Sequence, residues 1–209
     1  MVEEELRSPG QASDDALVAR LKEGYEDAFE ALVERYKKRA YYFAYGMLSN
    51  HEDAEDVSQE AFVRVYKHID SFREKASFKT WLYRIIINLC RSNLRKRYLV
   101  SKFSFNFRQK NEMTDEVEKT LETAVTDTHW ESDPLKSTAN KQLQKAIHNA
   151  ISTLSVKQKE AFVLKHMQGM KISEIADMLG CAEGTVKAHI SRAIGHLKQN
   201  LRDYEQEVD

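Results

Sequence analysis

The sequence predicts an all-α protein with two small helical domains, an N-terminal helical bundle and a C-terminal helix-turn-helix, joined by a flexible acidic linker. Three observations lead to this prediction. Only two prolines and seven glycines occur in 209 residues, and good helix formers dominate long stretches. Apolar residues recur at spacings of three and four in both halves of the chain. Between the halves this periodicity fails and acidic residues accumulate.

Four helices are expected in the first half. The segment 13–22 opens with Ser-Asp-Asp, a good helix cap, and the segment 26–48 carries an apolar stripe of helical period. A third helix is expected over 52–68, where carboxylates in the first turns suit the positive end of the helix dipole. A loop follows, and the fourth helix is expected over 80–98.

The fourth helix has two contrasting faces. Trp81, Ile85 and Leu89 form its apolar face. The opposite ridge is polar, at spacings of four, three and four, and consists of Arg84, Asn88, Arg91 and Arg95.

After residue 98 the helical pattern stops. Phe103, Phe105 and Phe107 alternate with polar residues, which predicts a short extended stretch before the acidic linker. Helical patterns return over 139–154 and 156–167, followed by two short helices around Gly180. We therefore expect tails over 1–12 and 205–209, domains over 13–98 and 136–204, and a linker over 99–135.

Charge is distributed in blocks along the chain, although the formal net charge is only -1. From Ser71 to Lys102 there are nine basic residues and one acidic residue, whereas Glu112–Asp133 holds eight acidic residues and one basic residue. Because salt screens fields within about 10 Å, each block acts locally. The basic block suits nucleic-acid phosphates.

Several function classes are disfavoured by the composition. Cys90 and Cys181 lie far apart without paired Cys or His, which excludes a disulfide framework or zinc site and suits a reducing cytoplasm. The acidic N-terminus is no signal peptide, and the most apolar window, 81–90, is too short to span a membrane. No glycine-rich phosphate loop, metal cluster or Ser/His/Asp arrangement occurs. We expect neither enzymatic activity nor a cofactor.

The strongest functional pattern is the helix-turn-helix. Ile175, Ala176 and Leu179 are expected to face inward on the first helix, and Gly180 supplies the positive φ that ends it. Val186 and Ile190 lock the second helix onto the first. The N-terminal part of that second helix would then enter the major groove of DNA.

Two further stretches carry a family resemblance. Residues 53–62 read DAEDVSQEAF, and SFR over 71–73 is followed by FKTWLYRI over 78–85. These motifs resemble the N-terminal domain of extracytoplasmic-function (ECF) sigma factors of bacterial RNA polymerase, and residues 154–201 resemble the C-terminal domain of the same family. The two resemblances occur in the family's order.

The resemblance implies a role for each surface. The acidic helix would bind the clamp coiled coil of the largest subunit of core RNA polymerase, through Asp53, Asp56, Gln59, Glu60 and Val63. The basic loop and following helix would bind the minus-ten promoter element as it melts, through Ser71, Arg73, Lys75, Lys79, Arg84, Asn88 and Arg91. The helix-turn-helix would bind the minus-thirty-five element, through Glu183, Thr185, Lys187, His189 and Arg192. Trp81, Phe72 and Phe78 are open between base stacking and core packing.

The resemblance also implies an anti-sigma partner, with Phe103, Phe105 and Phe107 as possible contacts, and a role in a stress or envelope response. This sequence departs from the family pattern at Lys171 and Ala182, where a capping Ser or Thr is common, and its minus-ten loop lacks a frequent glycine. The alternative function is an ordinary helix-turn-helix regulator that is not a polymerase subunit. That alternative leaves the acidic helix and the basic loop unexplained.

Overall fold

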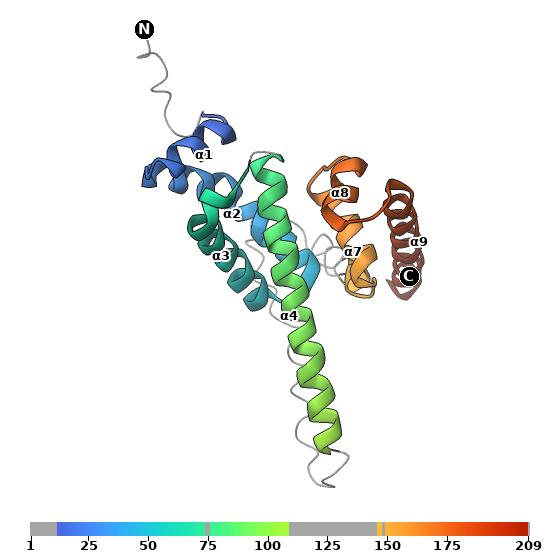
Figure 1. Cartoon of the computed structure of the whole chain (residues 1–209). Helices are drawn as coiled ribbons and strands as arrows, with labels where there is room; N and C mark the ends of the chain where they lie inside the picture. Colours follow the sequence, from blue (N-terminus) through green and yellow to red (C-terminus); the bar gives the residue numbers. More distant parts are fainter. Residues whose placement is uncertain (1–11, 74–75, 109–145, 148, 209) are drawn as a thin grey trace.

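The N-terminal half of the chain folds into a helical bundle (Figure 1). The computed structural model describes residues 12–73, 76–108, 146–147 and 149–208. Within them the bundle consists of α1 (Asp14–Lys22), α2 (Glu26–Leu48), α3 (His51–His68), a short 3-10 turn η1 (Ile69–Ser71) and α4 (Phe78–Arg108). The predicted ranges of α1, α2 and α3 agree with these bounds to within one residue.

Local hydrogen bonds explain where the first helices begin and end. The Oγ of Ser13 accepts a hydrogen bond from the N–H of Ala16, which caps α1. Ser49 adopts a left-handed conformation with φ of 56° and ends α2, and the Oδ1 of Asn50 accepts the N–H of Asp53 at 2.8 Å and caps α3. Ser49 and Asn50 therefore reverse the chain between α2 and α3, so that the two helices lie side by side.

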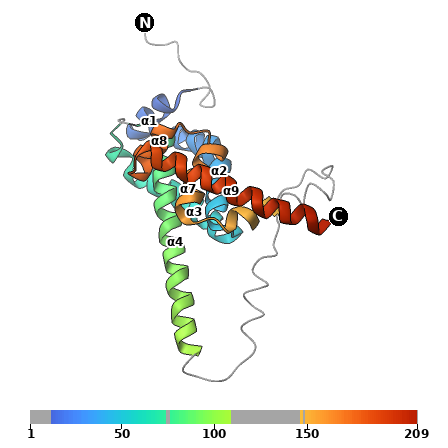
Figure 2. The same ribbon diagram turned by 90° about the vertical axis from the view of Figure 1, so that its right-hand side faces the viewer.

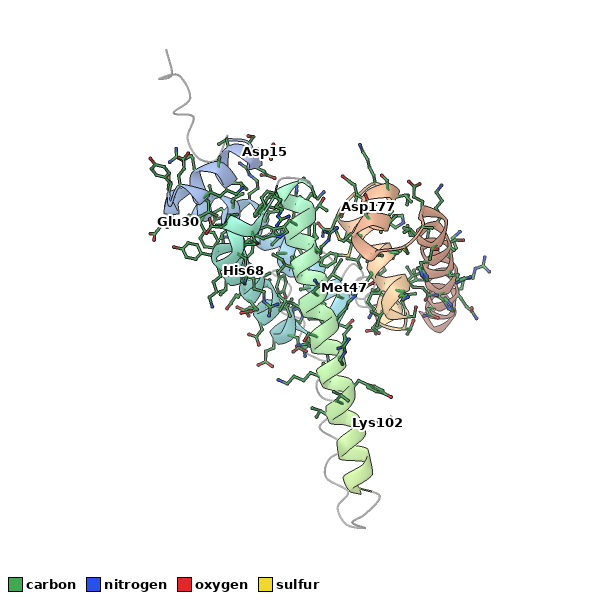
Figure 3. The ribbon with its side chains drawn as sticks, in the orientation of Figure 1. Asp15, Glu30, Met47, His68, Lys102 and Asp177 are labelled. Atoms are coloured by element: carbon green, nitrogen blue, oxygen red, sulfur yellow. The ribbon has the colours of Figure 1, made fainter. Side chains whose placement is uncertain are left out.

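Helix α4 is longer than the sequence predicted. It continues through Phe103, Phe105 and Phe107 to Arg108, so the expectation of an extended stretch there was wrong. The reason is that a nucleated helix gains one hydrogen bond for each further residue it fixes, so it can continue without an apolar stripe. The last turns extend away from the bundle, with Lys102 on this protruding part (Figures 1 and 3).

The buried surface of α4 is also wider than predicted. Leu89 is buried, but Trp81 and Ile85 are only partly buried. Phe78 and Leu82 are fully buried on this same face, and the buried surface extends around the helix to Tyr83, Ile86 and Cys90. This helix is covered from two sides, because it contacts α2 and α3 on one and the second domain on another.

The second domain is a helix-turn-helix built on α7 (Val156–Phe162). A capping box at Ser155 starts α7, which runs directly into a π-helical turn, η3 (Val163–Met167). Helix α8 (Ile172–Leu179) ends at Gly180 with φ of 66°, and α9 (Glu183–Val208) follows. The predicted inward residues Ile175, Ala176, Val186 and Ile190 are buried, and Leu179 is partly buried. Residues 146–147 and 149–152 are helical as predicted, whereas 139–145, with Leu143, lie outside the described residues.

The two domains contact each other in this structure. Helices α7 and α8 lie between α4 and α9 (Figure 1), and α9 crosses in front of them when the molecule is turned (Figure 2). A single cluster of buried apolar residues continues from α2 and α4 into η3, α8 and α9. No helix among the described residues is long and apolar enough to cross a membrane.

Candidate nucleic-acid and protein interfaces

Helix α3 presents three hydrogen-bond acceptors and one apolar side chain on its outer face. Four of the five predicted polymerase-binding residues are exposed there: Asp56, Gln59, Glu60 and Val63. They follow one another at spacings of three, one and three, which places them on one side of the helix. Glu60 is paired with Arg64 at 2.8 Å, an exposed i, i+4 pair that a stronger partner can replace.

Asp53 lies in a different place from the other four. Its carboxylate accepts hydrogen bonds from Asn93 at 2.9 Å and from Arg97 at 3.2 Å, both on α4. These contacts tie the start of α3 to α4. The geometry favours a positioning role for Asp53 rather than a place on the outer face.

An apolar patch lies beside the acidic row, and of its residues only Val63 was predicted from the sequence. Val63 and Tyr66 are 43% and 49% exposed, and the ring of Phe29 lies edge-on to that of Tyr66 with centroids 5.1 Å apart. Apolar side chains rimmed by charges are typical of protein-binding surfaces. Tyr66 could have been found from the sequence, because it lies three residues after Val63 and outside the buried stripe of α3.

The predicted minus-ten residues do not form one free surface. Ser71, Arg73, Arg84 and Asn88 are exposed, and Lys75 lies outside the described residues. Two others contact the second domain. Lys79 donates a hydrogen bond to the carbonyl of Gln168 at 2.8 Å, and Arg91 forms an ion pair with Glu160.

The aromatic side chains near this loop belong to the core. Phe72 and Phe78 are 5% and 0% exposed, and the ring centroids of Phe72 and Trp81 are 5.0 Å apart. Lys22 donates to the carbonyl of Phe72 at 2.9 Å, which fixes the loop against α1. Core packing therefore accounts for Phe72 and Phe78, while Trp81 is partly exposed at the edge of the cluster.

The start of α9 presents a polar surface to solvent. Glu183, Thr185, Lys187 and Arg192 are exposed, and His189 is partly buried, with no hydrogen-bond partner for its Nδ1 among the described residues. The first turn of a helix carries unpaired N–H groups and the positive end of the dipole. Together with Lys187 and Arg192, this arrangement suits DNA phosphates and base edges in the major groove.

Three buried groups near α4 have shifted acidities. Burial raises the pKa of the Cys90 thiol to about 12, and the negative charge of Glu160 adds to this shift. Burial also raises the pKa of Tyr83 to about 12. Burial lowers the pKa of Lys159, and the positive charge of Arg97 lowers it further. The described residues contain no group of three or more His, Cys, Asp or Glu that could hold a metal ion.

Comparison with known proteins identifies the family. Residues 32–99 match the family model of Sigma-70 region 2, and residues 144–197 match that of Sigma-70, region 4. The chain is 34% identical over 186 residues to the ECF RNA polymerase sigma factor SigW of Bacillus subtilis (strain 168), across 89% of this chain and 95% of that protein. This chain belongs to the ECF sigma factor family. An ECF RNA polymerase sigma-E factor of Haemophilus influenzae is 32% identical over 188 residues, across 88% of this chain and 92% of that protein.

The same fold occurs in a solved sigma-factor structure. The structure of the sigma factor RpoE from Bartonella quintana, in complex with the anti-sigma factor NepR, matches with a TM-score of 0.62 and 26% identity. The match covers 83% of this chain and 96% of that one.

Membership of the ECF sigma factor family answers the question of function class. Sigma factors of this family act with core RNA polymerase at promoters to initiate transcription. The match to region 2 accounts for the acidic helix and the basic loop, which an ordinary helix-turn-helix regulator left unexplained. The predicted family and function are confirmed.

Proposed function

We propose that this sigma factor divides its work among three surfaces. The outer face of α3 binds core polymerase, the loop over 71–79 with the exposed side of α4 binds the minus-ten element, and the start of α9 binds the minus-thirty-five element. The observation that carries the proposal is the separation of charge among exposed side chains. Acceptors gather on α3, whereas cationic and amide side chains gather on α4 and α9.

The chemistry of each surface suits its proposed partner. Asp56 and Glu60 on α3 are carboxylates that form charge-assisted hydrogen bonds with arginine side chains of a protein partner. Arg73 and Arg84 suit the phosphates of a melted strand, and Asn88 can read the edge of an extruded base. At the start of α9, Lys187 and Arg192 supply phosphate or guanine contacts in duplex DNA.

The setting of this activity is part of the proposal. We place the protein in the bacterial cytoplasm, in a stress or envelope response, and without catalysis or a cofactor of its own. The related RpoE structure contains an anti-sigma factor, and we propose that a protein of that class also regulates this chain. Phe103, Phe105 and Phe107 are proposed contacts, although their side chains lie outside the described ones.

In vitro transcription tests the proposal directly. Bacterial core polymerase is incubated with a pool of genomic fragments, with and without the protein, and the new 5′ ends are sequenced. New start sites that share two spaced upstream elements are the expected result. Tight DNA binding by the protein alone, without new start sites, would contradict the proposal.

A further inference from the structure

The last turns of α4 extend beyond the bundle, and no other described helix covers them. Helix α4 continues to Arg108, and none of the other described helices lies beside its end in either view (Figures 1 and 2). Lys102 marks this part of the helix in Figure 3. Residues 95–102 are called the arm below. The function proposed above names none of these residues.

Hydrogen bonds fix which side of the arm faces the bundle. Asn93 and Arg97 donate to the carboxylate of Asp53 at 2.9 and 3.2 Å. Arg97 also donates to the carbonyl of Leu48 at 3.3 Å. These contacts hold the base of the arm against the end of α2 and the start of α3. The opposite side of the helix therefore faces solvent.

This solvent-facing side combines apolar and cationic side chains. Four residues at i, i+3, i+4 and i+7 share one face of the helix: Arg95, Tyr98, Leu99 and Lys102. Tyr98 and Leu99 are 62% and 47% exposed, and Val100 beside them is 58% exposed. The ammonium of Lys102 lies over the ring of Tyr98, 5.7 Å from its centroid. The face thus has an apolar centre with a cation at each end.

No carboxylate on α4 offsets the positive charge of the arm. The sequence contains no Asp or Glu from Lys75 to Asn111, whereas this stretch contains ten Lys and Arg residues. Three of them are exposed on the arm and are called the arm cations: Arg95, Lys96 and Lys102. A surface of uniform positive charge attracts an anionic partner.

The aliphatic side chains distinguish between two anionic partners. A nucleic acid offers phosphates to cations and bases to aromatic rings, and neither gives Leu99 or Val100 an apolar environment. At the surface of a lipid bilayer, aliphatic side chains enter the acyl boundary and tyrosine lies at the level of the headgroups. The long side chains of Lys and Arg reach the lipid phosphates. The composition of the arm therefore fits a lipid surface.

We propose that the arm binds the surface of an anionic lipid bilayer. The arm cations bind the headgroup phosphates. Tyr98, Leu99 and Val100 enter the boundary between the headgroups and the acyl chains. Binding of this kind is reversible, because a short apolar patch and three cations hold a protein far more weakly than a spanning helix does. The proposal stands apart from the function proposed above and adds a lipid-binding site to the chain.

Vesicle sedimentation of the full chain tests the proposal. Vesicles of phosphatidylglycerol and phosphatidylethanolamine carry negative charge, and vesicles of phosphatidylcholine are the neutral control. We expect the wild type to sediment with the anionic vesicles and to remain in solution with the neutral ones. Added salt should release part of the bound protein, because salt screens the attraction between the arm cations and the phosphates.

The first variant removes the charge of the arm. It replaces each arm cation with Gln. Each Lys or Arg near an anionic surface strengthens binding about fivefold, so this triple variant should bind the anionic vesicles roughly a hundredfold more weakly. The matched control replaces three exposed lysines on α2, α3 and α9 with Gln: Lys38, Lys67 and Lys198. This control should keep most of the wild-type affinity.

The second variant removes the aliphatic surface and keeps every charge. Leu99→Gln combined with Val100→Gln should weaken vesicle binding about tenfold. Its affinity for a fluorescent, mixed-sequence single-stranded DNA should equal that of the wild type. The control is Val156→Gln, which changes an exposed valine of α7. Circular dichroism confirms that each variant is folded before it is compared.

Each outcome supports or overturns the proposal. Absence of the wild type from the anionic vesicle pellet would contradict it, and so would wild-type affinity in either arm variant. If the aliphatic variant loses single-stranded DNA binding as strongly as vesicle binding, the arm is a nucleic-acid contact and the proposal is wrong. Promoter-specific transcription by the wild type with core polymerase is measured separately. Failure of that assay would contradict the proposed function and would leave the vesicle results unchanged.

Discussion

At the scale of single residues, burial decides the chemistry of Cys90. Its side chain is 0% exposed in the middle of α4, and its pKa is raised from 9.0 to about 12, chiefly by burial. A thiol whose pKa is higher in the folded state stabilises that state fully below pH 9. This contribution is lost as the pH rises from 9 through 12.

This shift predicts an alkaline loss of stability that depends on Cys90. Between pH 9 and 11 the free energy of unfolding should fall by about 1 kcal/mol more per pH unit in the wild type than in Cys90→Ala. Urea denaturation at a series of pH values measures the difference. Parallel pH profiles for the two proteins would show that the thiol ionises equally well in the folded state.

At the scale of helices, the predicted ends were accurate where the stop signals are local. The cap at Ser13 and the reversal at Ser49 and Asn50 depend on residues within a few positions, so the sequence contains them fully. The end of α4 was not predictable in this way, because no cap or proline near residue 98 stops a helix that is already formed. The helix-turn-helix lies between these cases. Gly180 is a clear signal for the end of α8, whereas Lys171 and Ala182 are weak capping residues at the starts of α8 and α9.

The weak caps of the helix-turn-helix can be improved. Ala182 precedes α9 and its carbonyl accepts the N–H of Val186, but its side chain offers no acceptor to the first turn. Ala182→Ser should raise the free energy of unfolding by about 1 kcal/mol without loss of promoter binding. Thermal and urea denaturation measure the gain, and Ala182→Val, which also offers no acceptor to the first turn, serves as the control with only a small effect. An unchanged or lower melting temperature for the serine variant would refute the cap assignment.

A similar opportunity exists at Lys171, the residue before α8. Its N–H already donates to the carboxylate of Glu174 at 2.8 Å, but the lysine side chain has no acceptor for the first turn of the helix. Lys171→Ser should complete the capping box and add about 1 kcal/mol to the free energy of unfolding. Loss of this gain in the double variant Lys171→Ser with Glu174→Ala would confirm that the two side chains act together.

At the scale of the whole molecule, each domain could be predicted but their contact could not. The buried stripes and the exposed acidic and basic faces follow from periodicity, which is a local property. The pair Arg91 and Glu160 is separated by 69 positions, and nothing in the hydrophobic pattern marks either as the partner of the other. Likewise, nothing in the sequence indicates that the side chains of Val163 and Met167 pack against Gly46 of α2. The candidate DNA-binding residues were therefore predicted individually, whereas the contacts of Lys79 and Arg91 with the second domain were not.

The proposed division of labour predicts separable defects. Asp56→Arg should abolish binding to core polymerase, because it reverses a charge on the outer face of α3, while DNA binding by the second domain is kept. Arg192→Ala should weaken binding to the minus-thirty-five element by about tenfold and leave polymerase binding intact. Gel-shift and polymerase pull-down assays measure the two activities. Asp15→Arg, the same charge change on α1 (Figure 3), is the control, and equal damage by both variants to one activity would disprove the division.

The ion pair of Arg91 with Glu160 has a consequence for genetics. Because Glu160 is only 1% exposed, loss of the Arg91 side chain leaves a buried carboxylate without its charged partner, which destabilises the fold. A genetic screen for loss of function would therefore recover Arg91 variants for two separate reasons, the DNA contact proposed above and the stability of the protein. The amount of protein in the cell distinguishes them, because a destabilised variant becomes scarce whereas a variant that lacks only a DNA contact does not.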